Sequence, residues 1–257
     1  MIKQLSKTQE KVTFFVEGIN ETIANAIRRS TFEIPILAID EVEFIKNDSA
    51  LYDEVLAHRF GLIPLLSDKT FEEREKCSCK GKGCAKCTVS FKLQAKGPCT
   101  VYSSQLEGRT AKPVFDKMPL VILTKGQELE LNAYAILGKG KQHTKFSPGI
   151  IVYKPLVQMN IGKECNLCEE CIKVCPLNLI SSDGKKISFR DLEKCDICGA
   201  CTEACNKKGK KCINMNISKE SFIFVVESFG QLPAKEIFLE AIKLINKNLN
   251  ELSKQLK

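Results

Sequence analysis

Several features of common protein classes are missing from this sequence. Its 257 residues include no tryptophan and only two histidines, which excludes a metal site built from several histidines. There is no G-x-G-x-x-G run and no P-loop, which argues against a bound dinucleotide or nucleotide phosphate. Closely spaced carboxylates of the D-x-D-x-D kind are also absent. We therefore expect no catalytic residues in this chain.

Long apolar segments are missing too. No run approaches the roughly 18 apolar residues that a membrane-spanning helix needs. The first residues, MIKQLSKTQEKV, contain no apolar stretch of the kind found in signal peptides. We therefore expect a cytoplasmic protein with no membrane contact.

Cysteine is abundant, with fourteen residues. Thiols stay reduced in the cytoplasm, so clustered cysteines there indicate metal ligands rather than disulfides. Twelve of the fourteen fall into three groups of four. The remaining two, Cys99 and Cys212, are expected to be ordinary small side chains.

Two of the cysteine groups are copies of one motif. The spacing C-x2-C-x2-C-x3-C starts at Cys165 and again at Cys195. In two-cluster ferredoxins the fourth cysteine of each motif binds the other cluster. Cluster one is then expected to take Cys165, Cys168, Cys171 and Cys205. Cluster two is expected to take Cys175, Cys195, Cys198 and Cys201. We predict two [4Fe–4S] clusters.

The second copy of the motif departs from the first at one position. Pro176 follows Cys175, whereas Asn206 follows Cys205. Proline fixes the backbone and stiffens the chain at that point. We therefore expect Cys205 to be held less firmly. A module that binds only one cluster, or a three-iron form of cluster one, remains an alternative.

The third group lies in the stretch CSCKGKGCAKC. Its members are Cys77, Cys79, Cys84 and Cys87. Two cysteine pairs around a Gly/Lys loop can provide the four thiolates of a tetrahedral site. We predict one structural Zn²⁺, with an iron site or redox-labile thiols as alternatives.

The formal net charge of +8 suggests, on its own, an acidic partner such as nucleic acid. Metal changes this balance, because a [4Fe–4S]²⁺ core or a zinc ion on four thiolates carries a charge of about 2−. Two clusters and one zinc ion would lower the total from +8 to about +2. We therefore expect little or no direct DNA contact.

Apolar periodicity predicts how the rest of the chain is organised. Strands are expected over residues 11–17, 38–45 and 221–228, and helices over residues 21–30, 51–65 and the C-terminal segment. Asn20 is expected to cap the first helix, and Gly61 is expected to be the C-cap of the second, with Pro64 just beyond it. An α/β unit thus begins near the N-terminus, is interrupted by two cysteine-bearing modules, and finishes at the C-terminus.

The C-terminal helix carries one narrow apolar stripe. Its residues are spaced 4, 3, 4, 3 and 4 apart: Phe238, Ile242, Ile245, Leu249, Leu252 and Leu256. This heptad-type spacing indicates packing on another helix. That helix is either the one at residues 21–30 or one from a partner subunit.

Three flanking stretches resemble a known family. They are NAIRRS (residues 25–30), EVLAHRFGLIPL (54–65) and VESFGQLPAKEIFLEAI (226–242). They resemble the D subunit of archaeal DNA-directed RNA polymerase, a family related to the bacterial alpha N-terminal domain and to the third-largest subunit of eukaryotic polymerase II. Some members carry a ferredoxin-like insert at the same place.

The resemblance implies a fold of class α+β in three parts. Residues 1–45 and 214–257 would form a discontinuous alpha-subunit-like dimerisation domain. Residues 46–160 would form an inserted β-rich domain with the four-cysteine site, and residues 161–213 the ferredoxin-like iron–sulfur domain.

The resemblance also implies a function. In this family the D subunit pairs with subunit L, is joined by subunits N and P, and supports the large catalytic subunits. The stripe at Phe238, Ile242, Ile245, Leu249 and Leu252 would contact subunit L. By family position, Arg28, Arg29, His58 and Arg59 would contact the second-largest subunit. The iron–sulfur domain would then be structural or redox-responsive. The alternative, from the cysteine repeat alone, is a ferredoxin-type electron-transfer protein.

Overall fold

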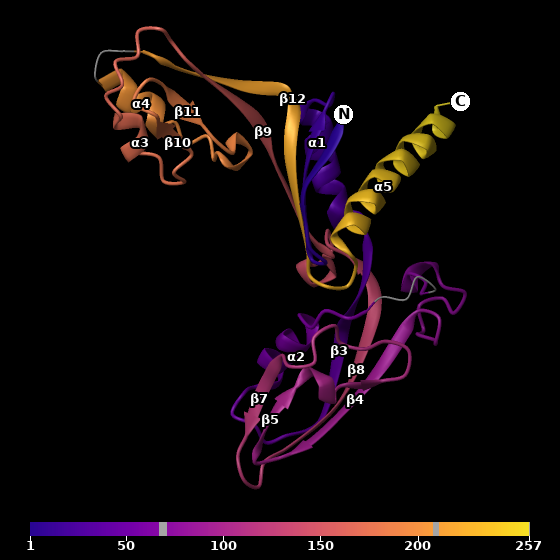
Figure 1. The fold of residues 1–257 in the computed structure, drawn as a ribbon. Coiled ribbons are helices and arrows are strands. Elements are labelled where there is room, and N and C mark those ends of the chain that lie inside the picture. The colour runs from indigo at the N-terminus through magenta and orange to yellow at the C-terminus, as the bar shows by residue number, and fades with distance from the viewer. Residues whose placement is uncertain (67–70, 208–210, 257) are drawn as a thin grey trace. The chain divides into compact units, whose positions relative to one another are not determined.

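The computed structural model describes residues 1–66, 71–207 and 211–256. The chain divides into two compact units, and it passes between them several times (Figure 1). The first unit comprises Met1–Leu5, Thr13–Asn25 and Val152–Val225. The second comprises Ser6–Val12, Ala26–Ile151 and Val226–Lys257.

One four-stranded sheet has the order β1-β2-β12-β9. Its strands are β1 (Ile2–Lys7), β2 (Lys11–Glu17), β9 (Gly149–Ile161) and β12 (Ile213–Ser228). Strand β2 alternates as predicted, with Val12, Phe14 and Val16 buried. Within the first unit the ring of Phe14 stacks on Phe224 with centroids 5.6 Å apart. The predicted strands at residues 11–17 and 221–228 are confirmed, and the second is longer than predicted.

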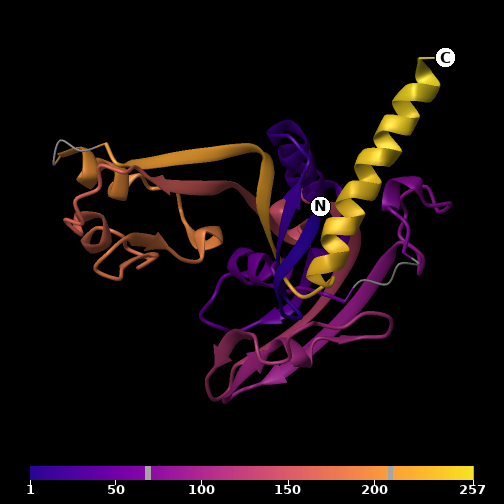
Figure 2. The same cartoon turned by 45° about the horizontal axis from the view of Figure 1, so that its top comes forward.

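Helix α1 (Glu21–Ser30) and helix α5 (Ala234–Gln255) are the two long predicted helices. The side chain of Asn20 accepts a hydrogen bond from the backbone N–H of Ile23 at 2.9 Å, which is the predicted N-cap. Helix α5 continues as one unbroken helix towards the C-terminus (Figure 2). Its buried face carries Ala234, Ile237 and Ala241.

The second unit holds a separate β-rich core. Strands β3 (Pro35–Asn47), β8 (Glu128–Lys139), β4 (Thr88–Lys96) and β6 (Glu107–Gly108) form a sheet of order β3-β8-β4-β6. Strands β5 (Cys99–Tyr102) and β7 (Pro119–Leu123) form an antiparallel pair. Alternation in β4 points Phe91 and Leu93 into the core, because successive side chains of a strand face opposite sides.

Helix α2 (Asp53–Gly61) packs against this core with Leu56 and Phe60 fully buried. It begins at Asp53, two residues after the predicted start, and it ends at Gly61, within one residue of the predicted end. Short 3-10 helices occur at Thr31–Glu33, Arg74–Lys76, Ser103–Gln105, Thr144–Phe146 and Leu192–Lys194.

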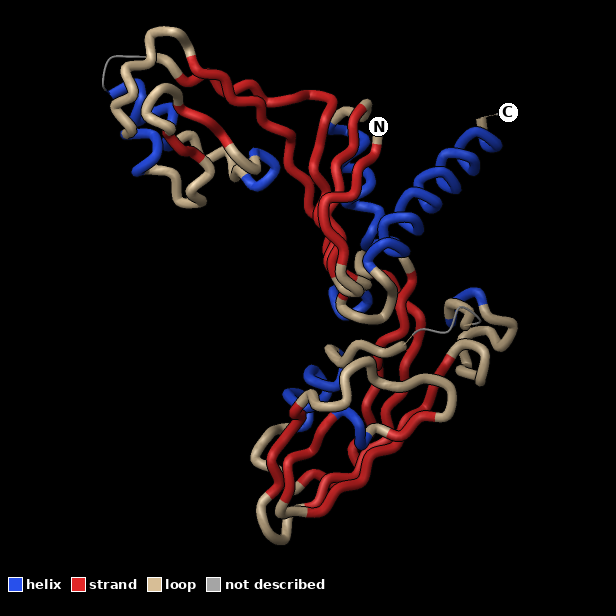
Figure 3. The backbone as a smooth tube through the Cα atoms, in the orientation of Figure 1, coloured by secondary structure: helices blue, strands red, loops and turns tan. Residues whose placement is uncertain are grey.

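The cysteine repeat lies between β9 and β12 in the first unit. It contains two short helices, α3 (Glu170–Lys173) and α4 (Ala200–Lys207), and a hairpin of β10 (Ile180–Ser182) and β11 (Ile187–Phe189). Loops make up much of this module (Figure 3). The backbone N–H of Gly162 donates to the carbonyl of Cys212 at 2.7 Å, where the two long strands enter the module.

The predicted α+β class is confirmed by this mixture of sheets and helices. The three-part division at residues 45/46, 160/161 and 213/214 stays a prediction. In the described part of the chain, no helix combines the length and the apolar character that crossing a membrane requires.

Candidate metal centres

The two cysteine motifs share one backbone conformation. Leu167 and Ile197 occupy the same motif position, and both have φ of +58°. Two residues further on, Glu169 and Gly199 also share positive φ values, +59° and +76°. Glycine adopts this left-handed conformation easily, whereas another residue pays roughly 1–2 kcal/mol. Because this costly conformation is repeated, both loops are expected to surround the same kind of ligand.

A first cavity in this module gathers the cysteines expected for cluster one. Its lining residues are Ile161, Cys165, Asn166, Cys168, Glu169, Cys171, Ile187, Cys205, Cys212 and Ile213. The structure thus places Cys205, from the second motif, beside three cysteines of the first. It also adds a cysteine that the motif spacing does not contain, Cys212.

A second cavity gathers the cysteines expected for cluster two. Its lining residues are Met159, Cys175, Leu179, Ile180, Phe189, Leu192, Cys195, Cys198, Gly199, Cys201 and Met215. The backbone N–H of Leu179 donates to the Cys175 sulfur at 3.4 Å. Such N–H donors suit a thiolate ligand, because they stabilise its negative charge.

Strand β9 supports the loop of the second motif. The ammonium group of Lys154 donates to the backbone carbonyl of Cys195 at 3.0 Å and lies 3.7 Å from the carboxylate of Asp196. Sequence reasoning missed Lys154, because nothing in its local sequence distinguishes it from other lysines.

The donor sets fit iron–sulfur clusters. Each cavity offers four thiols from the motif positions, with mostly apolar residues between them. Burial raises the pKa of the Cys171 and Cys201 thiols, so cluster binding there must displace their protons.

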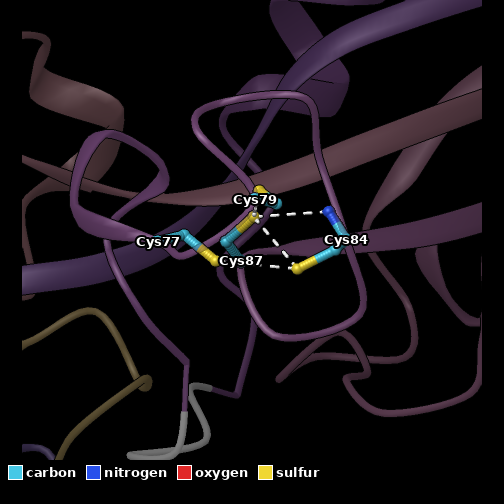
Figure 4. A group of neighbouring side chains, drawn as sticks. All are labelled: Cys77, Cys79, Cys84 and Cys87. Atoms are coloured by element: carbon cyan, nitrogen blue, oxygen red, sulfur yellow. Dashed lines mark hydrogen bonds between the residues drawn. The ribbon is translucent and has the colours of Figure 1, made fainter.

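The third cysteine group lies in the second unit, on the loop before β4. Figure 4 shows the four side chains Cys77, Cys79, Cys84 and Cys87 converging on one point. The sulfurs of Cys77 and Cys84, and those of Cys79 and Cys87, are 3.6 Å apart, and those of Cys84 and Cys87 are 3.8 Å apart. Zinc–sulfur bonds of about 2.3 Å in a tetrahedron place the sulfurs about 3.8 Å apart. The group therefore has the dimensions of a single-ion tetrahedral site.

The thiols of this group have unequal proton affinities. Burial raises the pKa of Cys79, but hydrogen bonds from Cys87 and Cys77 outweigh burial and lower the pKa to about 6. A backbone hydrogen bond from Cys79 lowers the pKa of Cys77, but burial and the thiol of Cys84 outweigh it and raise the pKa to about 12. One thiolate is thus ready for a metal at neutral pH.

Arg74 holds the loop that carries these cysteines. Its Nε donates to the backbone carbonyl of Gly81 at 3.0 Å, and its Nη1 donates to the carboxylate of Glu41 on β3 at 3.2 Å. Sequence reasoning missed Arg74, because its two partners are far apart in the sequence. Cys99 lies outside this group, and its thiol donates to the carbonyl of Lys96 at 3.4 Å.

The residues expected to contact partner subunits lie at or near the surface. Along the α5 stripe, Phe238, Ile242 and Ile245 are half-buried, whereas Leu249 and Leu252 are 58% and 52% exposed. Arg29, His58 and Arg59 are exposed, and Arg28 is half-buried. The guanidinium of Arg59 donates to the carbonyl of Pro119 at 3.1 Å.

Two family models match separate parts of the chain, and each part contains one of the two kinds of cysteine site. Residues 36–152 match the RNA polymerase Rpb3/RpoA insert domain. Residues 159–206 match the 4Fe-4S dicluster domain, which together with the cysteine-lined cavities supports iron–sulfur binding.

Curated relatives match over nearly the whole chain. The DNA-directed RNA polymerase subunit Rpo3 of Archaeoglobus fulgidus is 35% identical, over 98% of this chain and 96% of the relative. The Rpo3 of Methanothermobacter thermautotrophicus is 37% identical, over 93% and 92%. The Rpo3 of Pyrococcus horikoshii is 36% identical, over 98% of both chains. The chain therefore belongs to the Rpo3 family, the D subunits of archaeal DNA-directed RNA polymerases.

Proposed function

We propose that this protein is the non-catalytic assembly subunit of an archaeal RNA polymerase in the cytoplasm. It would pair with subunit L, be joined by subunits N and P, and form the platform for the large catalytic subunits. The observation that carries this proposal is the family match together with Leu249 and Leu252 of the α5 stripe, which are more than half exposed. A long helix with leucines more than half exposed gains stability when a partner covers them.

The two halves of α5 have different tasks in this proposal. Ala234, Ile237 and Ala241 are buried within the chain and fix the first half of the helix. Leu249 and Leu252 lie beyond them and remain exposed. The first half would attach α5 to its own chain, and the second half would bind subunit L.

Arg28, Arg29, His58 and Arg59 are proposed contacts for the second-largest subunit. The first two close helix α1, and the other two lie in the last turn of α2. Cations at helix C-termini complement the helix dipole, so their positions are also favourable within the chain itself. Replacing His58 and Arg59 separately would show which of the two roles each side chain has.

The iron–sulfur module would hold two [4Fe–4S] clusters, and the third group one Zn²⁺. The clusters would mainly stabilise the fold, because the buried core of the module is small. That core contains Cys171, Ile180, Ile187 and Cys201, so two of its four buried members are themselves proposed ligands. Cluster loss would loosen the module and weaken assembly of the large subunits, so assembly would respond to redox conditions.

Anaerobic purification of the tagged chain from its own cells tests this function. We expect the catalytic core of RNA polymerase to copurify, with about eight irons, eight sulfides and one zinc per chain. A stable monomer with intact clusters, absent from the polymerase and reduced rapidly by a cellular oxidoreductase, would instead establish the ferredoxin-type alternative. A matched preparation of the untagged strain controls for nonspecific capture.

A further inference from the structure

The first cavity contains five cysteines, although a [4Fe–4S] cluster uses four. The additional one is Cys212, which lies just before β12 and has only 3% of its surface exposed. Beyond the four expected ligands, the described residues that line the second cavity include no cysteine. The two sites therefore differ by one buried thiol.

The position of Cys212 relates it to one ligand in particular. Its thiol is hydrogen bonded to the thiol of Cys205. Each iron of a [4Fe–4S] cluster takes one cysteine, so a fifth thiol can bind only by replacing one of the four. Of the four ligands, Cys205 is the one whose thiol is hydrogen bonded to Cys212, so it is the ligand that Cys212 is expected to replace.

The backbone around the two cysteines differs as well. Cys205 lies in α4, which continues to Lys207 because Asn206 stands where the first motif has a proline. Cys212 adjoins β12, and its carbonyl accepts the 2.7 Å hydrogen bond from Gly162 at the base of the module. Cys212 is thus held by strand pairing, whereas Cys205 lacks the proline that stiffens the equivalent position of the other motif.

We propose that Cys212 is an alternative fourth ligand of cluster one that exchanges with Cys205. In the exchange, the iron–sulfur bond to Cys205 breaks as the bond to Cys212 forms. The proton of the Cys212 thiol passes to the departing Cys205 sulfur, and no electron is transferred. The exchange keeps cluster one fully coordinated when Cys205 detaches. This inference rests on the proposed presence of a cluster in the first cavity.

Alanine variants of the full-length chain test the exchange. Alanine is preferred to serine because a serine hydroxyl could itself bind iron. After anaerobic purification, iron and sulfide are counted per chain and the reduced clusters are examined by electron paramagnetic resonance. We expect Cys205→Ala to keep the iron content of the wild type, and Cys205→Ala/Cys212→Ala to lose about half of it. Equal iron loss in both variants would overturn the proposal.

The matched control is Cys175→Ala, which removes the fourth ligand of the second cluster. That cavity has no spare cysteine among its described residues, so we expect this variant to lose iron from cluster two. If Cys175→Ala keeps as much iron as Cys205→Ala, retention does not depend on a spare thiol and the proposal is wrong.

A milder variant covers the case in which Cys205→Ala does not fold. Cys212→Ala leaves all four motif ligands of cluster one in place. We expect a chelator to remove iron from cluster one roughly tenfold faster than in the wild type, as for the loss of other residues that support metal ligands. An unchanged rate would count against exchange. A wild-type chain without cluster one would overturn the proposed cluster and its ligand exchange together. Two clusters in the wild type and only one in Cys205→Ala would overturn the role of Cys212 alone.

Discussion

Replacing two exposed leucines of α5 should weaken binding of subunit L without weakening the fold. Leu249→Gln and Leu252→Gln remove apolar side chains that are 58% and 52% exposed. Leucine and glutamine have similar helix propensities, so the helix itself should persist. The double variant therefore isolates the apolar surface that is available to a partner.

The expected magnitude follows from the exposed fractions. Full burial of a leucine side chain contributes about 1.5–3 kcal/mol. About half of each side chain remains to be buried, so the two leucines together should contribute about 2 kcal/mol to pairing. The dissociation constant with subunit L should rise roughly 30-fold.

Calorimetric titration of the purified chain with subunit L measures this change. Asn250→Gln/Ser253→Gln is the matched control, because both residues are exposed and each follows one of the leucines. We expect the control to bind as the wild type does and both variants to unfold at the wild-type temperature. Wild-type affinity in the leucine variant, or equal weakening in the control, would refute the assignment of this stripe to subunit L.

Three further predictions concern the metal sites and the β-rich core. Replacing Cys195, Cys198 and Cys201 with serine should leave pairing with subunit L intact but reduce incorporation of the large subunits. Pull-down from co-expressing cells measures both quantities. Equal loss of pairing and incorporation would contradict this division of roles. In the zinc-free chain, the pKa of Cys79 should be about 6, well below that of an ordinary thiol, because hydrogen bonds from Cys87 and Cys77 stabilise its thiolate. Ultraviolet thiolate absorbance of the zinc-free protein measures this pKa, and an ordinary thiol pKa would contradict the prediction. Phe91→Ala should lower the free energy of unfolding by about 3–5 kcal/mol, because this side chain is fully buried, and urea titration checks the value.

Much of the fold could be predicted from local patterns. Alternation in residues 11–17, the Asn20 cap and the heptad spacing of α5 each have a local physical cause, and the structure contains all three elements. The start of α2 and the start of β12 were harder to predict. An element's end depends on tertiary contacts as well as on local propensity, and these are not visible in the sequence.

The candidate metal sites were predictable to a different degree. Fixed spacing identifies motif cysteines, because ligands of one cluster must lie close together along the chain or in a repeat. Cys212 belongs to no such spacing, and only its place at the end of the β9–β12 pair brings it into the first cavity. Lys154 and Arg74 act through backbone carbonyls of distant loops, which no local pattern records.

Strands β9 and β12 connect the cysteine module directly to the four-stranded sheet. Ile161 ends β9 and Ile213 begins β12, and both line the first cavity. Lys154, also on β9, holds the loop of the second motif. Loss of a cluster would therefore act first on the ends of two neighbouring strands. The exposed leucines of α5 belong to the other compact unit, so we expect pairing with subunit L to outlast cluster loss.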